Sequence, residues 1–284
     1  MKEIIVLSGK GGTGKTTIMA ALTNLTPNAV LADCDVDAPN LHMLIDGEKI
    51  EEHEFIASDV AQLDASICTL CGICVEACRF DAISLDDIPT VDDISCEGCG
   101  LCSRICPVQA ITMAERVSGR WSATMTPTSM MFHARLEPGE GNSGILVTLL
   151  KRRAREYASE VDASLILVDG PPGIGCPVIA SLSGADIALL VTEPSKSGKS
   201  DVERIIKLCR QMNVQPTIVI NRWDLHPSMA EDIEDMANEE KIPLLGRIPF
   251  DEDVHCNAAK GLTVGTGPAG EAIERIWEAM QKML

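Results

Sequence analysis

A chain of 284 residues, 45% of them hydrophobic, is long enough for one large domain with a sizeable core and one small domain. The formal net charge of −18 disfavours nucleic acid and anionic membrane surfaces as partners, because both bind clusters of Lys and Arg. No apolar run reaches the ~18 residues of a membrane span, and the N-terminus lacks the pattern of a signal peptide. We therefore expect a cytoplasmic protein with neither a nucleic acid nor a membrane partner.

Short apolar segments alternate with amphipathic ones along most of the chain. This alternation predicts an α/β fold with a doubly wound, mostly parallel sheet covered by helices on both faces. Between residues 59 and 115 the composition shifts to Cys, Asp and Gly and the alternation stops, which predicts a small inserted α+β domain at 59–115 within a larger domain of 1–58 and 116–284. In chain order, strands are predicted at 3–7, 29–32, 164–168, 187–192, 217–220 and 244–248, and helices from Lys15 and at 145–157, 199–212, 228–239 and 269–283.

A glycine-rich segment, residues 9–16, follows the first strand and precedes the first helix. It matches the phosphate-loop pattern G-x-x-x-x-G-K-[ST], in which backbone N–H groups and a helix N-terminus surround phosphate oxygens. Lys15 is expected to contact the β- and γ-phosphates, and Thr16 to help hold Mg²⁺. The alternative is a plain Gly-rich turn with a surface lysine. The nucleotide-binding residues predicted here are Gly11, Gly12, Thr13, Gly14, Lys15, Thr16 and Thr17.

Acidic residues follow two apolar strands. Asp33 and Asp35 come after the second strand, and Asp169 ends the strand at 164–168. Ligand sites of open α/β sheets lie at the carboxyl ends of strands, so Asp35 and Asp169 are candidates for the Mg²⁺ site together with Thr16. An aspartate at a strand end is otherwise often a turn or cap residue.

The segment Lys10-Gly11-Gly12-Thr13-Gly14-Lys15-Thr16-Thr17 resembles the phosphate loop of the MinD/ParA/Mrp and nitrogenase-iron-protein superfamily, and the similarity extends over nearly the whole chain. The resemblance implies an ATPase that works as a homodimer or as a heterodimer with a related ATPase. It implies that Lys10 reaches the partner's phosphates, that Asp35 orients the attacking water and that Asp169 is the Walker B aspartate. Without the resemblance, Lys10 is an ordinary solvated lysine.

Base recognition is predicted at two further loops. Asn221 in the segment Asn221-Arg222-Trp223-Asp224 resembles the adenine-contacting asparagine of this superfamily. The same segment resembles the N-K-x-D guanine motif of GTPases, from which Arg222 departs. Pro249 lies in a segment similar to the loop that closes over the base, although simple hydrophobic packing accounts for it equally well.

Eight of the twelve cysteines form two runs with the same spacing, C-x2-C-x2-C-x3-C, 28 residues apart. The pattern is identified as that of bacterial two-cluster ferredoxins, in which the fourth cysteine of each run ligates the other cluster. Two structural zinc sites are the alternative. Arg79 stands where the pattern has proline, which removes no ligand. The predicted ligands are Cys68, Cys71, Cys74 and Cys106 for one [4Fe–4S] cluster, and Cys96, Cys99, Cys102 and Cys78 for the other.

Of the remaining cysteines, Cys34 and Cys209 are predicted to be packed in the core. Cys176 resembles in position the cysteine that bridges a cluster between subunits of the nitrogenase iron protein, with a buried thiol as the alternative. The sequence predicts an ATP-binding and ATP-hydrolysing dimer that couples nucleotide state to electron transfer through its clusters to a redox partner. An alternative is an ATP-dependent factor that assembles or inserts a metal centre into an acceptor protein, and a positional switch of the MinD or ParA kind is disfavoured by the acidic charge.

Overall fold

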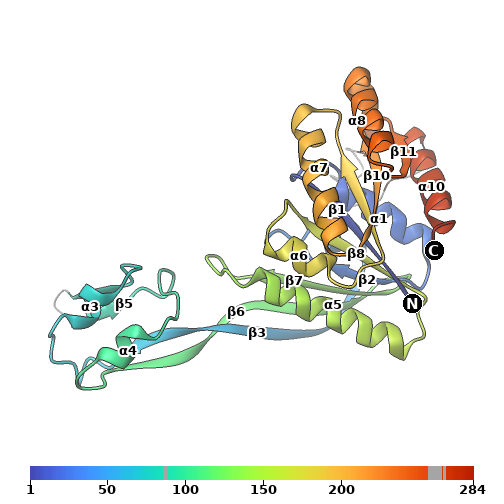
Figure 1. Ribbon diagram of the computed structural model, residues 1–284. Coiled ribbons are helices and arrows are strands. Elements are labelled where there is room, and N and C mark those ends of the chain that lie inside the picture. The colour runs from blue at the N-terminus through green and yellow to red at the C-terminus, as the bar shows by residue number, and fades with distance from the viewer. Residues whose placement is uncertain (86–88, 255–263, 265–266) are drawn as a thin grey trace. The chain divides into compact units, whose positions relative to one another are not determined.

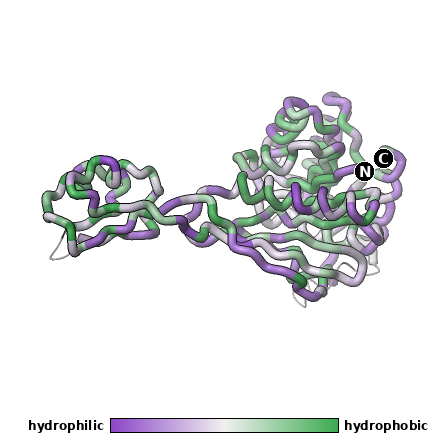
Figure 2. Tube along the Cα trace, turned by 90° about the horizontal axis from the view of Figure 1, so that it is seen from below, coloured by the Kyte–Doolittle hydropathy of each residue, from purple (hydrophilic) through white to green (hydrophobic). Residues whose placement is uncertain are grey.

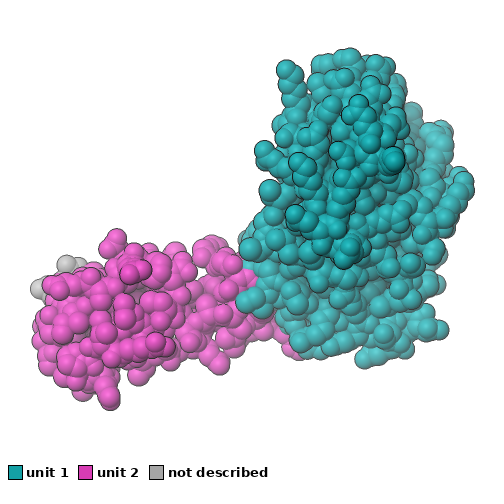
Figure 3. Space-filling view, viewed as in Figure 1, with its two compact units in different colours: residues 1–52, 121–135, 143–284 teal, residues 53–120, 136–142 magenta. Residues whose placement is uncertain are grey.

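The computed structural model describes residues 1–85, 89–254, 264 and 267–284, which form two compact units (Figure 3). Unit 1 comprises residues 1–52, 121–135 and 143–284, and unit 2 comprises residues 53–120 and 136–142. The insertion predicted at 59–115, with both cysteine runs, falls inside unit 2. None of the helices described has the length and apolar composition needed to cross a membrane.

In the part of the chain that the structure describes, the main sheet has nine strands, and most neighbouring strands run parallel (Figure 1). The mostly parallel α/β sheet that was predicted is therefore confirmed. The strands, in spatial order, are β11 (Leu244–Ile248), β10 (Gln215–Asn221), β9 (Ile187–Thr192), β1 (Lys2–Ser8), β8 (Leu165–Pro172), β2 (Val30–Asp33), β7 (Met130–Leu136), β6 (Ile111–Met125) and β3 (Glu48–Leu63).

Helices cover both faces of this sheet in unit 1 (Figure 1). Ile4 and Val6 of β1 belong to the core built with α1 and α10, whereas the alternate residues Ile5 and Leu7 are buried on the other face. Alternation along a strand sends successive side chains to opposite faces, so a strand covered on both sides is apolar throughout. Figure 2 shows hydrophobic residues gathered inside this unit. The helices are α1 (Lys15–Leu25), α2 (Leu41–Leu44), α5 (Ser143–Glu160), α6 (Cys176–Leu182), α7 (Lys196–Gln211), α8 (Pro227–Glu239) and α10 (Pro268–Gln281), with a 3₁₀ turn η1 (Trp223–Leu225).

Strands β3, β6 and β7 were not among the predicted elements. The first seven side chains of β3, from Glu48 to Glu54, are all exposed and mostly charged, so this half of the strand carries no apolar run. β6 and β7 are neighbours joined by only four residues, which requires an antiparallel pair at this edge of the sheet. Unit 2 holds two short helices, α3 (Ile73–Ala77) and α4 (Leu101–Ile105), and an antiparallel pair of strands, β4 (Ile83–Leu85) and β5 (Pro89–Val91).

A buried ion cluster ties α5 to the sheet. The Lys151 ammonium lies 2.7 Å from Glu3 Oε1, and Arg155 Nε lies 2.8 Å from Glu3 Oε2. Lys151 also donates to the carbonyl groups of Ser181 and Ser183, at the end of α6. Burial lowers the pKa of Lys151, and the attraction of Glu3 opposes that shift. Because α6 follows β8 closely, this cluster keeps the segment after Asp169 in a defined position.

His133 on β7 makes the stability of unit 1 depend on pH. Its ring stacks on that of His42 with centroids 5.2 Å apart, and its Nε2 lies 2.9 Å from Thr124 Oγ1. Burial and then the positive charges of His42 and Lys49 lower the pKa of His133 to about 4. An unfolded histidine takes up its proton near pH 6.5. The unfolded state therefore binds more protons than the folded state between these values, and stability is lost as the pH falls through this window.

We expect His133→Gln to remove this loss. Between pH 7 and pH 4 the free energy of unfolding of the wild type should fall by about 2–3 kcal/mol more than that of the variant. The measurement is urea unfolding at several pH values, followed by fluorescence of the three tryptophans, all of which lie in unit 1. Equal pH slopes for the two proteins would show that His133 titrates normally in the folded state.

Candidate functional site

The glycine-rich loop between β1 and α1 is an open backbone cradle. Gly12 and Gly14 have φ angles of 82° and 89°, in the left-handed region that favours glycine. A Cβ atom added to Gly11 or Gly12 would meet no atom within 4 Å, so the space beside the loop is free for a ligand. Gly14 directly precedes α1. The backbone N–H groups of the loop and the N-terminus of α1 are therefore suited to bind an anion.

Lys15 lies at the centre of an acidic cluster at the carboxyl ends of β2 and β8. It is 6% exposed, and its Nζ is 2.7 Å from Asp169 Oδ1 and 3.9 Å from Asp35 Oδ2. Nζ also lies 3.3 Å from Thr16 Oγ1. Burial works against the charge of Lys15, but Asp169, Asp33 and Asp35 outweigh it and raise the pKa of Lys15. The predicted residues Lys15, Thr16, Asp35 and Asp169 are therefore brought together.

This cluster has more carboxylates than cations. Asp33 is fully buried, and burial followed by repulsion from Asp169 raises its pKa to about 7. Burial also raises the pKa of Asp35, against the attraction of Lys15. Asp169 Oδ2 and Thr13 Oγ1 are buried without a hydrogen-bond partner. Carboxylate and hydroxyl oxygens around an excess of negative charge suit Mg²⁺, so the residues present fit that ion.

Lys10 lies apart from this cluster. Its side chain is 42% exposed, and its ammonium lies 3.4 Å from Glu193 Oε2 in the same chain. Glu193 follows β9, and its Oε1 accepts a hydrogen bond of 2.6 Å from Arg222. Arg222 also donates to the carbonyl of Gly12, at 3.4 Å. Sequence reasoning missed Glu193, because nothing in its local pattern links it to Lys10, 183 residues away.

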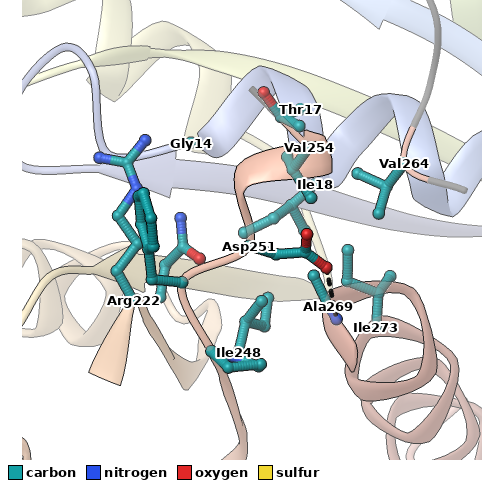
Figure 4. A pocket seen from close by; sticks show the side chains of 13 residues that line it. Gly14, Thr17, Ile18, Arg222, Ile248, Asp251, Val254, Val264, Ala269 and Ile273 are labelled. Atoms are coloured by element: carbon teal, nitrogen blue, oxygen red, sulfur yellow. Dashed lines mark hydrogen bonds between the residues drawn. The ribbon is translucent and has the colours of Figure 1, made fainter. Parts of the chain in front are cut away.

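An open hollow adjoins the glycine-rich loop, and both polar and apolar side chains line it (Figure 4). Asn221 and Pro249, both predicted to contact the base, line it together with Gly14 and Thr17. The Asn221 side chain is almost fully buried and donates to the Thr13 carbonyl at 2.8 Å, so it also braces the loop. Gly14 is needed for this approach, since a Cβ there would lie 2.4 Å from Asn221 Nδ2.

Four cysteines from both runs surround one hollow in unit 2. Cys78 of the first run and Cys96, Cys99 and Cys102 of the second all line this hollow. The walls between them are apolar and include Ala61, Ile83 and Met113. These four cysteines are the set predicted for one cluster. Soft thiolates in an apolar setting are a suitable donor set for an iron–sulfur cluster.

The other predicted set is brought together in part. Cys68 and Cys71 lie close enough to Cys74 to add to the effect of burial in raising its pKa. Cys106 Sγ accepts a hydrogen bond from the N–H of Ala110 at 3.2 Å, and such N–H groups lower its pKa despite some burial. Among the described residues, no three His, Cys, Asp or Glu side chains are grouped closely enough to share a single metal ion. A [4Fe–4S] cubane does not require side chains that share one metal ion, because each of its four cysteines binds a separate iron. The ligand set of Cys106 with the first run stays a prediction.

The remaining described cysteines are of two kinds. Cys34 and Cys209 are fully buried, as predicted, and burial raises the pKa of both thiols. Cys176 is exposed at the start of α6, facing the beginning of α5 at Gly144. The alternative of a buried thiol at Cys176 is therefore wrong, because the residue stands at a helix N-terminus on the surface. Its role as a bridging ligand stays a prediction, and Cys256 lies outside the described residues.

The family model of the CobQ/CobB/MinD/ParA nucleotide binding domain matches residues 4–264. The chain belongs to this family. Members share the nucleotide-binding domain for which the family is named, and the glycine-rich loop and the Lys15 cluster lie within the matched residues. The matched residues include the cysteine-rich segment.

Three similar proteins extend this result. The chain is 33% identical to "Uncharacterized protein MJ0578" of Methanocaldococcus jannaschii, over 99% of this chain and 97% of that protein. It is 23% identical to the "Cytosolic Fe-S cluster assembly factor Nubp1 homolog" of Drosophila simulans, over 96% of this chain and 79% of that one. The fold resembles that of the septum site-determining protein MinD from Pyrococcus horikoshii, solved with Mg-ADP, with a TM-score of 0.59, 18% identity and coverage of 99% and 96%.

Proposed function

We propose that the chain is an ATP-hydrolysing, dimeric iron–sulfur protein that couples its nucleotide state to electron transfer through two [4Fe–4S] clusters. The observation that carries the proposal is the hollow lined by Cys78, Cys96, Cys99 and Cys102, in the same chain as a nucleotide site of the MinD/ParA kind. A chain that only switched position with ATP would have no need of eight thiols in this arrangement.

In the nucleotide half, the loop N–H groups and Lys15 bind the phosphates, while Thr16, Asp35 and Asp169 hold Mg²⁺. Asp169 Oδ2 supports this role, because it is buried without a hydrogen-bond partner. Asp35 orients the attacking water, and Asn221 and Pro249 contact the adenine. Lys10 leaves Glu193 and reaches the phosphates of the partner subunit, where it neutralises charge that develops on the transferred group.

In the cysteine half, Cys96, Cys99, Cys102 and Cys78 hold one cluster, and Cys68, Cys71, Cys74 and Cys106 hold the other. Bound clusters supply one-electron transfer. The chain's own contribution is to orient the thiols and to shield one side of the site with apolar groups, as Ala61, Ile83 and Met113 do at the described hollow.

A second candidate is an ATP-dependent factor that assembles or inserts a metal centre. It is favoured by the similarity to a Drosophila protein named as an Fe-S cluster assembly factor. The two candidates differ in the fate of the clusters, since an electron carrier keeps them and an assembly factor transfers them. Eight cysteine ligands for two clusters leave no open coordination position, which favours the electron carrier.

The test is a redox titration of the anaerobically purified chain, followed by EPR, with and without Mg-ATP. We expect Mg-ATP to shift the midpoint potential or line shape of at least one cluster, and the shift to vanish in Lys15→Ala, which cannot bind the nucleotide. Identical titrations with and without Mg-ATP, together with ATP-dependent loss of iron to an apo-ferredoxin, would replace electron transfer by cluster assembly.

A further inference from the structure

Arg116 of β6 is the centre of a hydrogen-bond network in unit 2. Its Nε lies 2.7 Å from Glu140 Oε1 and 3.2 Å from Ser58 Oγ. Its Nη1 donates to the carbonyl groups of Asp93 and Cys96, the latter at 3.1 Å. One guanidinium thus joins a carboxylate to the backbone of a cysteine that lines the hollow.

Glu140 has its two oxygens occupied. Oε1 forms the ion pair with Arg116, and Oε2 accepts a hydrogen bond of 3.1 Å from Ser58 Oγ. Ser58 Oγ also lies 2.9 Å from Ser118 Oγ. Glu140 is 6% exposed and Arg116 is 19% exposed. Removing a charged pair from water is costly, and apolar residues would often serve stability as well. Stability alone therefore does not account for the charged pair, and its position beside Cys96 suggests a role at the cysteine site.

The turn of the second cysteine run packs closely against strand β3 within unit 2. Gly98 has a φ angle of 64°, and a Cβ there would lie 2.3 Å from the carbonyl oxygen of Asp59 in β3. The position 28 residues earlier is Leu70, which has a similar φ of 57° but is half exposed. The two repeats therefore have different surroundings, and Arg116 contacts the second run.

We propose that Arg116 is a positioning residue that sets the reduction potential of the cluster held by Cys78, Cys96, Cys99 and Cys102, and that Glu140 moderates its charge. The proposal rests on the proposed function, because it requires a cluster at this site. One-electron reduction adds a negative charge to the cluster. A nearby guanidinium stabilises the reduced form and raises the potential, and a nearby carboxylate does the opposite. Hydrogen bonds to the ligand backbone also fix the ligand's orientation.

The experiment is an EPR-monitored redox titration of the full-length chain with its clusters, without nucleotide. Arg116→Gln should lower the midpoint of one cluster by a tenfold change in its reduction equilibrium, about 59 mV for one electron. Glu140→Gln should raise the same midpoint, and Arg116→Lys, which keeps the charge, should stay close to the wild type. The other cluster is the internal reference. Arg120→Gln is the matched control, because Arg120 lies on the same strand and pairs with Glu54 at the surface.

Shifts of opposite sign in Arg116→Gln and Glu140→Gln identify an electrostatic effect, since mere loosening of the site would move both variants in the same direction. Unmoved midpoints, or shifts of the same sign, overturn this inference while leaving the proposed function intact. If Arg116→Gln loses the cluster, Glu140→Gln and Arg116→Lys decide the question alone. Wild-type protein without iron and sulfide after anaerobic purification and reconstitution would overturn both proposals.

Discussion

Lys10→Ala is expected to lower the rate of ATP hydrolysis by about 10³-fold while changing the affinity for Mg-ATP by no more than about fivefold. The reason is geometric. In a single chain the Lys10 ammonium is engaged by Glu193 at 3.4 Å and lies apart from the cluster of Lys15, Asp35 and Asp169. Its loss should leave binding largely intact and remove the charge that the partner subunit would supply.

Hydrolysis is measured by phosphate release, and binding by equilibrium titration with a fluorescent ATP analogue. Lys15→Ala is the contrasting variant, because the loss of its buried ammonium should abolish binding itself. Glu193→Gln frees Lys10 from its ion pair and should keep or raise the hydrolysis rate. Hydrolysis by Lys10→Ala at the wild-type rate would mean that each subunit works alone.

Cys78→Ala is expected to remove one cluster, about half of the bound iron, and to spare the other. Cys78 lines the hollow with Cys96, Cys99 and Cys102, although it belongs to the first run in sequence. The loss of a single thiolate from a four-cysteine site should leave an incompletely ligated and labile cluster. Iron and sulfide content per chain and the EPR spin count of the reduced protein measure the effect.

Double substitutions show which cysteines bind the same cluster. Cys78→Ala combined with Cys99→Ala should lose no more iron than either change alone, because both act on one cluster. Cys78→Ala combined with Cys71→Ala should lose both clusters. The opposite pattern, with Cys71 and Cys78 acting together, would assign each run to its own cluster. Cys209→Ala, in the core of unit 1, serves as the control that retains both.

Some elements of the fold were predictable because their cause is local. The strand at 187–192 coincides with β9, since an apolar run between turns is typical of a central parallel strand. The exposed edge was not predictable in this way. β3 is charged over its first half, and its pairing with β6 depends on residues about 60 positions later.

The sequence by itself determined the phosphate loop and the two cysteine runs, because their chemistry depends on residue types at fixed short spacings. It also determined the alternation of buried strands and helices, which follows from side-chain periodicity. Only the tertiary structure decided which distant groups meet. Lys10 meets Glu193, and Arg116 meets Glu140 and the Cys96 carbonyl, through contacts that leave no local pattern. Such contacts arise from the order of strands in the sheet and the path of loops, which many sequences with the same short motifs do not share.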